Sequence, residues 1–469
     1  MFIGREYEIN KLNELYKSNK FELVIIYGRR RVGKTTLISN FCNDKESIFY
    51  VGEELNNELS LQKFTNVVTK HWNENQYIDK FSNWESAFRY VLDKSDNKRT
   101  VLVIDEFPYI AGVNRSIMST LQNLIDHSLK DSKLFIILCG SSISFMENDV
   151  LGYKSPLFGR RTAQLEIKPL DFFDMIKMFK DYSEEEQIKL YSIIGGTPHY
   201  MNLMKGEKNF RENVTKNVLD KGSYIYREPI NLLKQELREP YLYNSIIQAI
   251  GTGSTKLNEI ALKIAEKTDK TSNYIRVLCD LKIVEKIRPI TDKENSKKTL
   301  YRLSDNLFKF YYKYISQNED LIEQDLVEYL FDEEINKNFS EYLGFIYEDI
   351  CMQYLKRLNK EMKLPFVVSK FGKWWGKKSA KKIEEEIDIV AVNKDSAIVV
   401  ECKYKNSRVG TDVLDRLMEK SILLPQKNKF YFIFSKAGFD DKLIEISKKN
   451  ENIYLFRDLT INTSTSDVN

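Results

Sequence analysis

Residues 28–35 read GRRRVGKT, which matches the phosphate-binding pattern G-x-x-x-x-G-K-[ST]. In such a loop the glycines let backbone N–H groups close around phosphate oxygens, the lysine reaches the β and γ phosphates, and the final hydroxyl binds Mg²⁺. The pattern predicts a site for a nucleoside triphosphate with Mg²⁺; the alternative is a glycine-rich turn without a ligand. The residues predicted to surround the phosphates are Gly28, Arg29, Arg30, Arg31, Val32, Gly33, Lys34, Thr35 and Thr36.

Two acidic residues, Asp105 and Glu106, follow the apolar run 101–104. A buried strand that ends here would deliver both carboxylates to the carboxyl edge of a sheet, where the ligands of parallel sheets bind. Asp105 would hold Mg²⁺ through water, and Glu106 would orient or deprotonate the attacking water. An acidic pair after a strand is often only a solvated loop, but the upstream phosphate-binding pattern favours hydrolysis.

Further polar residues could complete this site. Ser141 and Ser142 follow the apolar run 134–138, where a hydroxyl could sense the γ-phosphate. Arg160 and Arg161 lie in a turn-rich segment, and an arginine aimed at the γ-phosphate stabilises the transition state. A surface basic pair is an equally good interpretation of the two arginines.

A second constellation of charged residues lies near the other end of the chain. Residues 383–391 and 397–404 read as two strands joined by the turn 393–396. The strand period of two puts Glu401 and Lys403 on the same face, and pairing across the hairpin can bring Asp388 beside them. Asp388 and Glu401 could bind Mg²⁺, while Lys403 steers the bound water and stabilises charge on a scissile phosphate. The alternative is a half-buried hairpin with charges on its solvated face.

The segment 370–382 interleaves six lysines with three aromatic residues just before that hairpin. It predicts a surface that follows phosphates and stacks on bases, and the alternative is a twisted hairpin with packed tryptophans. The residues predicted to contact DNA here are Lys373, Trp374, Trp375, Lys377 and Lys378.

The elements that must position these groups follow from the alternation of strands and helices in the first 205 residues, which predicts an α/β fold with a parallel sheet. Three helical patterns over 241–281 precede strands at 282–287 and 299–303, the order of a winged helix-turn-helix. Such a module either reads DNA or relays motion between domains. The residues that would contact DNA are Lys270, Thr271, Ser272, Asn273 and Arg276 on the third helix, with Lys297 and Lys298 on the wing.

Composition narrows the class of protein. A chain of 469 residues is long enough for about three domains, and its net charge of +4 is too small to indicate nucleic acid by itself. Five scattered cysteines and three histidines argue against a zinc site or a disulfide framework. No apolar run approaches the roughly 20 residues that span a bilayer, and the first residues do not resemble a leader, so we expect a cytoplasmic protein.

Five motifs within residues 1–205 together resemble the archaeal-type ATPase family, a STAND/AAA+-related group of P-loop ATPases. They read FIGRE from Phe2, YGRRRVGKT from Tyr27, IDEFPY from Ile104, LFGRR from Leu157 and GGTPHY from Gly195. The resemblance implies that ATP is the nucleotide, with Gly4 and Arg5 near the base and Ser141 or Ser142 as the sensor. It also implies an arginine finger at Arg160 or Arg161, acting within the chain or across a homo-oligomer.

The spacing D-x12-E-x-K, with a glutamate on an upstream helix, resembles the PD-(D/E)xK nuclease superfamily over residues 300–457. The similarity is to the DUF234-type domain that is often fused to archaeal-type ATPases. It implies an active-site set of Glu348, Asp388, Glu401 and Lys403. Ile387 stands where the superfamily usually has proline.

These interpretations combine into one prediction: a P-loop ATPase whose nucleotide state, with Mg²⁺, controls a nuclease-like domain that acts on double-stranded DNA. The alternative is a regulatory ATPase whose C-terminal domains bind DNA or protein without cutting. The predicted domains are an ATPase core with the start of a lid (1–205), a helical lid or linker (206–238), a winged helix-turn-helix (239–305), a nuclease-like α/β domain (306–460) and a frayed tail (461–469).

Overall fold

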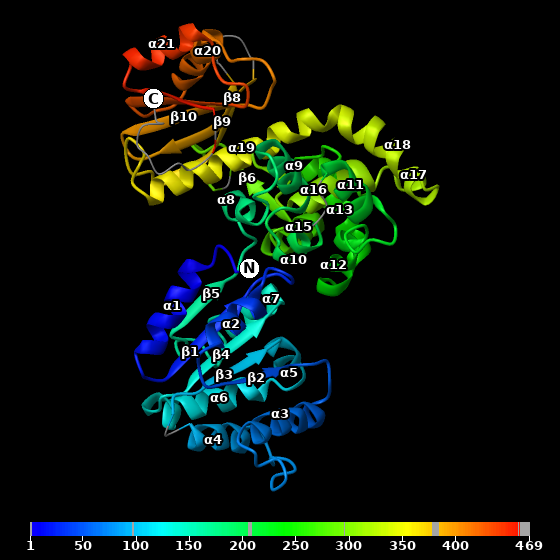
Figure 1. The fold of residues 1–469 in the computed structure, drawn as a ribbon, viewed down its shortest axis with the longest axis vertical. Coiled ribbons are helices and arrows are strands. Elements are labelled where there is room, and N and C mark those ends of the chain that lie inside the picture. The colour runs from blue at the N-terminus through cyan, green and yellow to red at the C-terminus, as the bar shows by residue number, and fades with distance from the viewer. Residues whose placement is uncertain are drawn as a thin grey trace. The chain divides into compact units, whose positions relative to one another are not determined.

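The computed structural model describes residues 2–95, 98–204, 209–294, 296–377, 384–457 and 459. The chain forms two compact units (Figure 1). The first comprises Met1–Leu170 and Gly196–Leu203, and the second comprises Asp171–Gly195 and Met204–Asn469. The finer boundaries expected after residues 205, 238 and 305 stay predictions, and the expected frayed tail lies outside the described residues.

Within its described residues, the first unit contains a five-stranded sheet in the order β2-β3-β4-β1-β5. All pairings in it are parallel, which confirms the fold class predicted from the alternating pattern. Every residue of the three inner strands is buried, as expected for a sheet covered on both faces. The strands are β1 (Glu22–Tyr27), β2 (Ser47–Val51), β3 (Val101–Asp105), β4 (Phe135–Gly140) and β5 (Ala163–Glu166).

Helices cover both faces of this sheet. α1 (Glu6–Lys17) and α2 (Lys34–Cys42) share one apolar core with alternate residues of β1, β3 and β4. The opposite face packs against four helices, α3 (Asn57–His71), α4 (Trp84–Lys94), α5 (Phe107–Val113) and α6 (Ser116–His127). The carboxyl ends of β1, β3 and β4 therefore meet at one edge, where α2 and α5 begin.

The second unit begins with a helical part. Its main helices are α9 (Glu184–Ile194), α12 (Glu228–Glu236), α13 (Pro240–Gly251), α14 (Leu257–Lys263) and α15 (Thr268–Asp280). The last three precede an antiparallel pair, β6 (Val284–Ile287) and β7 (Leu300–Leu303), in the element order that the sequence predicted. The aromatic segment that follows forms α16 (Asn306–Phe310), and most of its side chains are buried.

A second five-stranded sheet, in the order β12-β11-β10-β9-β8, lies in the described part of the second unit. β8, β9 and β10 pair antiparallel, while β10, β11 and β12 pair parallel. The predicted hairpin is β9–β10, with Val400 opposite Ile389. The strands are β8 (Lys370–Lys377), β9 (Glu384–Val392), β10 (Ser396–Lys403), β11 (Asn428–Ser435) and β12 (Ile453–Phe456).

The long helix α19 (Lys337–Lys360) contacts β9 and β10 and packs Tyr354 against Phe434 and Phe456. α20 (Thr411–Ser421) and α21 (Asp441–Lys449) pack against the opposite apolar cluster of the sheet. A layer of helix therefore covers each face, and the polar residues of the hairpin lie where α19 and α20 approach the ends of β9 and β10.

The remaining elements are short. The short α-helices are α7 (Ile143–Phe145), α8 (Phe172–Met175), α10 (Pro198–Leu203), α11 (Phe210–Val214), α17 (Glu319–Glu323) and α18 (Val327–Tyr329). The 3₁₀ and π-type turns are η1 (Leu129–Asp131), η2 (Met146–Val150), η3 (Ile176–Met178), η4 (Thr215–Leu219), η5 (Tyr311–Ile315) and η6 (Leu330–Asn336).

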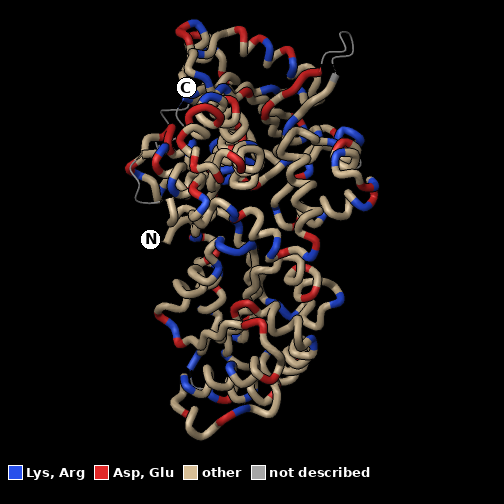
Figure 2. Tube along the Cα trace, turned by 90° about the vertical axis from the view of Figure 1, so that its right-hand side faces the viewer, with Lys and Arg blue, Asp and Glu red and all other residues tan. Residues whose placement is uncertain are grey.

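Basic and acidic residues are interspersed along the chain, in keeping with the small net charge (Figure 2). In the part of the chain that the structure describes, no helix is both long enough and apolar enough to cross a membrane.

Candidate functional site

The phosphate-binding pattern forms the connection between β1 and α2. Gly28 and Gly33 have φ angles of 151° and 91°, which favour glycine, and a Cβ on Gly28 would lie 2.2 Å from the carbonyl oxygen of Ile167. Lys34 is only 6% exposed, and its Nζ donates to the carbonyl oxygens of Gly28 (2.8 Å) and Arg29 (2.9 Å). The lysine is therefore held inside the loop that is predicted to enclose the phosphates.

The first residues after the loop meet the acidic pair. Thr35 Oγ1 donates to Asp105 Oδ2 at 2.8 Å, and the backbone N–H of Glu106 donates to Asp105 Oδ1 at 2.9 Å. The structure thus places together the hydroxyl and the carboxylate that the sequence predicted as Mg²⁺ ligands. An oxygen donor set of this kind suits Mg²⁺, which binds through one or two protein oxygens plus phosphates and water.

Glu106 has a left-handed backbone conformation with φ of 50°, at the start of α5. Its Oε2 accepts hydrogen bonds from Ser141 Oγ (2.8 Å) and from the backbone N–H of Ser141 (3.2 Å). Of the two serines proposed as sensor, Ser141 therefore contacts the predicted catalytic carboxylate, whereas Ser142 precedes α7 without a side-chain capping bond. Both bonds end on Oε2, so Oε1 is the oxygen that would meet a water.

Arg5 is 7% exposed and donates to the carbonyl oxygens of Val32 (3.0 Å) and Lys168 (2.6 Å). These bonds fix the segment containing Gly4 against the phosphate-binding loop. The contact of Gly4 and Arg5 with a base stays a prediction.

The two candidate finger arginines have different surroundings. Arg160 is held by Asp126 of α6, through bonds of 2.9 Å from Nε and 2.7 Å from Nη2. Arg161 stacks on Phe158, and among the described residues its buried Nη1 has no hydrogen-bond partner. Burial raises the pKa of Tyr27 at the end of β1 to about 12, and the positive charge of Arg161 opposes that shift. Arg161 is therefore the one whose charge reaches the end of β1.

In the second unit, the hairpin brings Asp388 and Glu401 together. Asp388 Oδ2 accepts a hydrogen bond of 2.8 Å from the backbone N–H of Cys402. Burial, together with the charges of Glu401 and Glu348, raises the pKa of Asp388 to about 7. Such a shift means that the three carboxylates lie close enough to repel one another, which is typical of functional sites.

Glu401 is balanced by two lysines. Its Oε1 accepts from Lys403 Nζ at 2.5 Å, and its Oε2 accepts from Lys420 Nζ of α20 at 3.3 Å. The Glu401 side chain is only 10% exposed, so these contacts compensate a largely buried charge. Lys420 also borders a cavity of about 210 Å³, which is lined in addition by Glu385, Arg416, Glu419 and Leu423. Lys420 could not be predicted from the local sequence, because only the folded structure brings α20 to Glu401.

Glu348 on α19 forms an ion pair with Lys373 of β8, and the two side chains are 16% and 12% exposed. Burial raises the pKa of Glu348, and Lys373 opposes that shift. The prediction that Lys373 follows DNA phosphates is therefore wrong for this structure, because its ammonium group is enclosed against Glu348. Trp374 also does not fit the predicted role of stacking on DNA bases, because it is 7% exposed and belongs to the apolar core of the sheet.

Adjacent strand residues face opposite sides of a sheet, and helices cover both faces here: Lys373 meets Glu348 of α19, while Trp374 packs in the apolar cluster under α20 and α21. Trp375 remains partly exposed. Lys377 is the last residue of β8, and Lys378 lies outside the described residues.

The described residues hold no group of three acidic, histidine or cysteine side chains that is already arranged around a metal position. Glu348 and Glu401 instead face lysines. Asp388 and Glu401 still fit Mg²⁺ chemically, because both are carboxylates and they lie beside each other in the hairpin. Mg²⁺ binding there would require Lys403 or Lys420 to give up its contact with an oxygen of Glu401.

The residues of α15 that were predicted to contact DNA differ in how exposed their side chains are. Asn273 and Arg276 are exposed and Ser272 is partly exposed, whereas Thr271 is fully buried and donates to the carbonyl oxygen of Lys267. The prediction for Thr271 is therefore wrong, because this side of the helix faces its own module. Lys270 pairs with Glu266 at 2.7 Å, while Lys297 and Lys298 on the loop between β6 and β7 are exposed.

Comparisons with known proteins agree with this architecture. Residues 2–204 match a family described as an ATPase domain predominantly from Archaea, and residues 311–414 match a family of archaeal and bacterial proteins of unknown function, DUF234. An uncharacterised protein of Methanocaldococcus jannaschii, MJECL04, is 36% identical over 97% of this chain and 99% of its own length. The chain is a P-loop ATPase of the α/β class. It belongs to the archaeal-type ATPase family with a C-terminal DUF234 domain.

Two further proteins are similar to parts of the chain. An uncharacterised ATP-binding protein of Pyrococcus horikoshii, PH0541, is 25% identical over 51% of this chain and 85% of its own length. The structure of a Walker-type ATPase of Pyrococcus abyssi superposes with a TM-score of 0.51 at 18% identity, covering 66% of this chain and 96% of that one. The second similarity shows a common fold.

Proposed function

We propose that ATP binding and hydrolysis in the first unit control the cleavage of double-stranded DNA, with Mg²⁺, by the acidic cluster of the second unit. The observation that carries the cleaving half is that Asp388, bonded to the backbone N–H of Cys402, lies beside Glu401 in the β9–β10 hairpin, where the charge of Glu348 also reaches it. Like charges are gathered in this way where a cation or a shared proton is to be bound.

In the first unit, Lys34 and the loop's backbone N–H groups neutralise the β and γ phosphates of ATP. Thr35 and Asp105 would hold Mg²⁺, which would neutralise charge on the phosphates, and Glu106 would align a water in line with the γ-phosphate. The ATP-binding relative PH0541 supports the choice of nucleotide.

In the second unit, Asp388 and Glu401 would hold Mg²⁺, which supplies a more acidic bound water and neutralises charge on the scissile phosphate. Lys403, next to Glu401, is placed to donate to a non-bridging phosphate oxygen once its carboxylate partner turns to the metal. Glu348 adds a third carboxylate. The reaction class is hydrolysis of a phosphodiester.

The three helices α13, α14 and α15 with the β6–β7 pair have the order of a winged helix-turn-helix, which suits double-stranded DNA. Asn273 and Arg276 would face base edges, while Lys297 and Lys298 would contact phosphates. A homo-oligomer would allow Arg161 or Arg160 to reach the nucleotide of a neighbouring subunit.

One assay tests this proposal. Supercoiled plasmid is incubated with the full chain and Mg²⁺ or Mn²⁺, with and without ATP, beside Asp388→Ala and Lys34→Ala. Nicking should disappear with Asp388→Ala and lose its ATP dependence with Lys34→Ala. Asp395→Ala is the matched control, because Asp395 is an exposed aspartate in the turn of the same hairpin. Nicking that survives Asp388→Ala contradicts the proposal.

The second candidate function is a regulatory ATPase that binds DNA without cutting it. The ion pairs of Glu348 with Lys373 and of Glu401 with Lys403 and Lys420 favour it, because they satisfy the carboxylates without a metal. DNA binding that depends on ATP, with no nicking in either metal, would select this alternative.

A further inference from the structure

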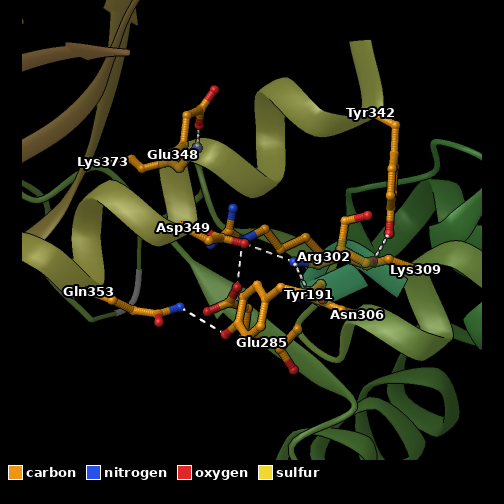
Figure 3. A network of polar contacts seen from close by, with 12 residues as sticks. Tyr191, Glu285, Arg302, Asn306, Lys309, Tyr342, Glu348, Asp349, Gln353 and Lys373 are labelled. Carbon is orange, nitrogen blue, oxygen red and sulfur yellow. Dashed lines mark hydrogen bonds and ion pairs between the residues drawn. The ribbon is translucent and has the colours of Figure 1, made fainter. Parts of the chain in front are cut away.

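Asp349, the neighbour of Glu348 on α19, is the centre of a network of ion pairs (Figure 3). Its Oδ1 accepts a hydrogen bond of 2.9 Å from Arg302 Nη2, and its Oδ2 accepts one of 2.8 Å from Lys309 Nζ. The three side chains are 23%, 27% and 15% exposed. Although burial acts the other way, Lys309 and Arg302 hold the pKa of Asp349 below its usual range.

Both cations come from outside the C-terminal sheet. Arg302 lies on β7 and also donates from Nε to Glu285 of β6 at 2.5 Å. Lys309 lies on α16 and contacts Asn306 Oδ1 at 3.3 Å. Asp349 therefore joins α19 to the β6–β7 pair and to the aromatic helix that follows it.

The other half of the Glu348–Lys373 pair is attached to the same module. The backbone N–H of Ile290, just after β6, donates to the carbonyl oxygen of Lys373 at 2.8 Å. Lys370 Nζ donates to the carbonyl oxygen of Ile290 at 2.6 Å, and a Cβ on Gly372 would lie 3.2 Å from Cβ of Ile290. The chain that leaves β6 thus runs directly beside β8.

We infer that Arg302 and Lys309, acting through Asp349, are positioning residues that set Glu348 against the Asp388–Glu401 pair. Glu348 and Lys373 both depend on the β6–β7 module for their place: Glu348 through Asp349 and Arg302, and Lys373 through Ile290. Displacement of this module, as by DNA phosphates bound at Lys297 and Lys298, changes the position of Glu348 relative to the acidic pair. This inference rests on the proposed metal site and adds its regulation.

A cluster of ion pairs can also serve only to hold two modules together, so the test needs a matched salt bridge that is merely structural. Arg357, eight residues after Asp349 on α19, donates to Asp171 from Nε at 2.7 Å and also pairs with Asp174 at 3.0 Å. Its side chain is 26% exposed, against 27% for Arg302. It binds two carboxylates as Arg302 does, but these belong to Asp171 and Asp174 rather than to Asp349.

The experiment compares Arg302→Met, Arg302→Lys and Arg357→Met in the full chain. Mn²⁺ binding is measured by calorimetry without nucleotide, with Asp388→Asn as the reference that lacks the site, and plasmid nicking gives kcat and KM. Arg302→Met should lower Mn²⁺ affinity and kcat by less than the roughly 10- to 100-fold that loss of a direct partner of a metal ligand costs, because Arg302 acts through Asp349, with KM for DNA little changed. Arg302→Lys should restore part of both, and Arg357→Met should change neither.

Melting temperatures are recorded for every variant. If Arg302→Met and Arg357→Met lose stability alike and both keep wild-type Mn²⁺ affinity, the network is only structural and the inference is wrong. If Arg302→Met does not fold, Lys309→Met replaces it, since Lys309 bonds the other oxygen of Asp349. If the protein binds Mn²⁺ but does not nick plasmid, the proposed cleavage is refuted. The Mn²⁺ affinity of Arg302→Met then still decides whether Arg302 is a positioning residue. Equal Mn²⁺ binding by wild type and Asp388→Asn overturns both.

Discussion

Replacing Asp388 by asparagine removes one negative charge from the acidic cluster while keeping the size of the side chain. The amide oxygen of asparagine can still accept the hydrogen bond from the backbone N–H of Cys402. At pH values where Asp388 is ionised, the substitution removes both the cost of burying that charge and its repulsion by Glu401 and Glu348. We therefore expect Asp388→Asn to be more stable than the wild type at neutral and alkaline pH, although it loses the proposed metal ligand.

The magnitude follows from the pKa of Asp388. Its value in the folded chain is about 7, whereas an unfolded aspartate titrates at about 3.9. Because the folded value is raised, the folded state binds more protons between these two values, and stability falls as pH rises from about 4 to about 7. One pKa unit corresponds to about 1.4 kcal/mol, so the upper limit is about 4 kcal/mol. Part of the side chain reaches solvent, and we expect about 2 kcal/mol or more at pH 8.

Hydrogen exchange of peptides from β9 and β10 in increasing urea measures the opening free energy of this sheet without requiring the whole chain to unfold together. The buffer contains EDTA. The gain of Asp388→Asn should be near zero at pH 4 and largest above pH 7, and added Mg²⁺ should stabilise only the wild type. Asp395→Asn is the control. A gain that is equal at pH 4 and pH 8, or absent at both, would refute the repulsion on which the proposed site depends.

Five further variants test other parts of the two sites. Glu106→Gln should keep ATP affinity and lose about 100-fold or more in hydrolysis rate, because the amide cannot take a proton; unchanged phosphate release would remove Glu106 from the mechanism. Arg161→Ala should lower hydrolysis by about 1000-fold if it is the finger, whereas Arg160→Ala should have a smaller effect, and the reverse ranking in a steady-state assay would exchange their roles. Lys403→Met should abolish plasmid nicking, while Lys420→Met should slow it by about tenfold; equal nicking by Lys420→Met and wild type would make Lys420 only a structural partner of Glu401.

Local sequence patterns predicted the phosphate-binding loop and the hairpin better than they predicted contacts between residues far apart in the sequence. The glycines and lysine of the phosphate-binding loop act within a few residues, so the loop could be expected from its spacing, and the alternation of strands and helices predicted the parallel sheet. The meeting of Thr35 with Asp105 could be expected because both follow strands whose carboxyl ends lie at one edge of such a sheet. The hairpin also followed from strand periodicity, and it brings Asp388 beside Glu401 as expected.

The contacts that were missed depend on tertiary structure. Lys420 reaches Glu401 from a helix 19 residues further along the chain, and Asp349 meets Arg302 across 47 residues. The periodicity of apolar residues along the chain carries no information about contacts of this kind. Lys373 was misassigned because an alternating lysine and aromatic pattern looks the same on a surface and on a strand that helices cover on both faces. The two adjacent acidic residues Glu348 and Asp349, placed among the aromatic and aliphatic residues 345–351, were the one signal that could have pointed to Asp349.

The left-handed backbone of Glu106 has a consequence for how the first site can be altered. A residue other than glycine or asparagine in this conformation carries about 1 kcal/mol of strain, so local folding alone would favour a different residue at position 106. Glutamine keeps both the strain and the shape of the side chain. Glycine or asparagine relieves the strain at the same time as it removes the carboxylate. Loss of hydrolysis in those two variants would therefore come with a firmer start of α5, and only Glu106→Gln separates the charge from the backbone.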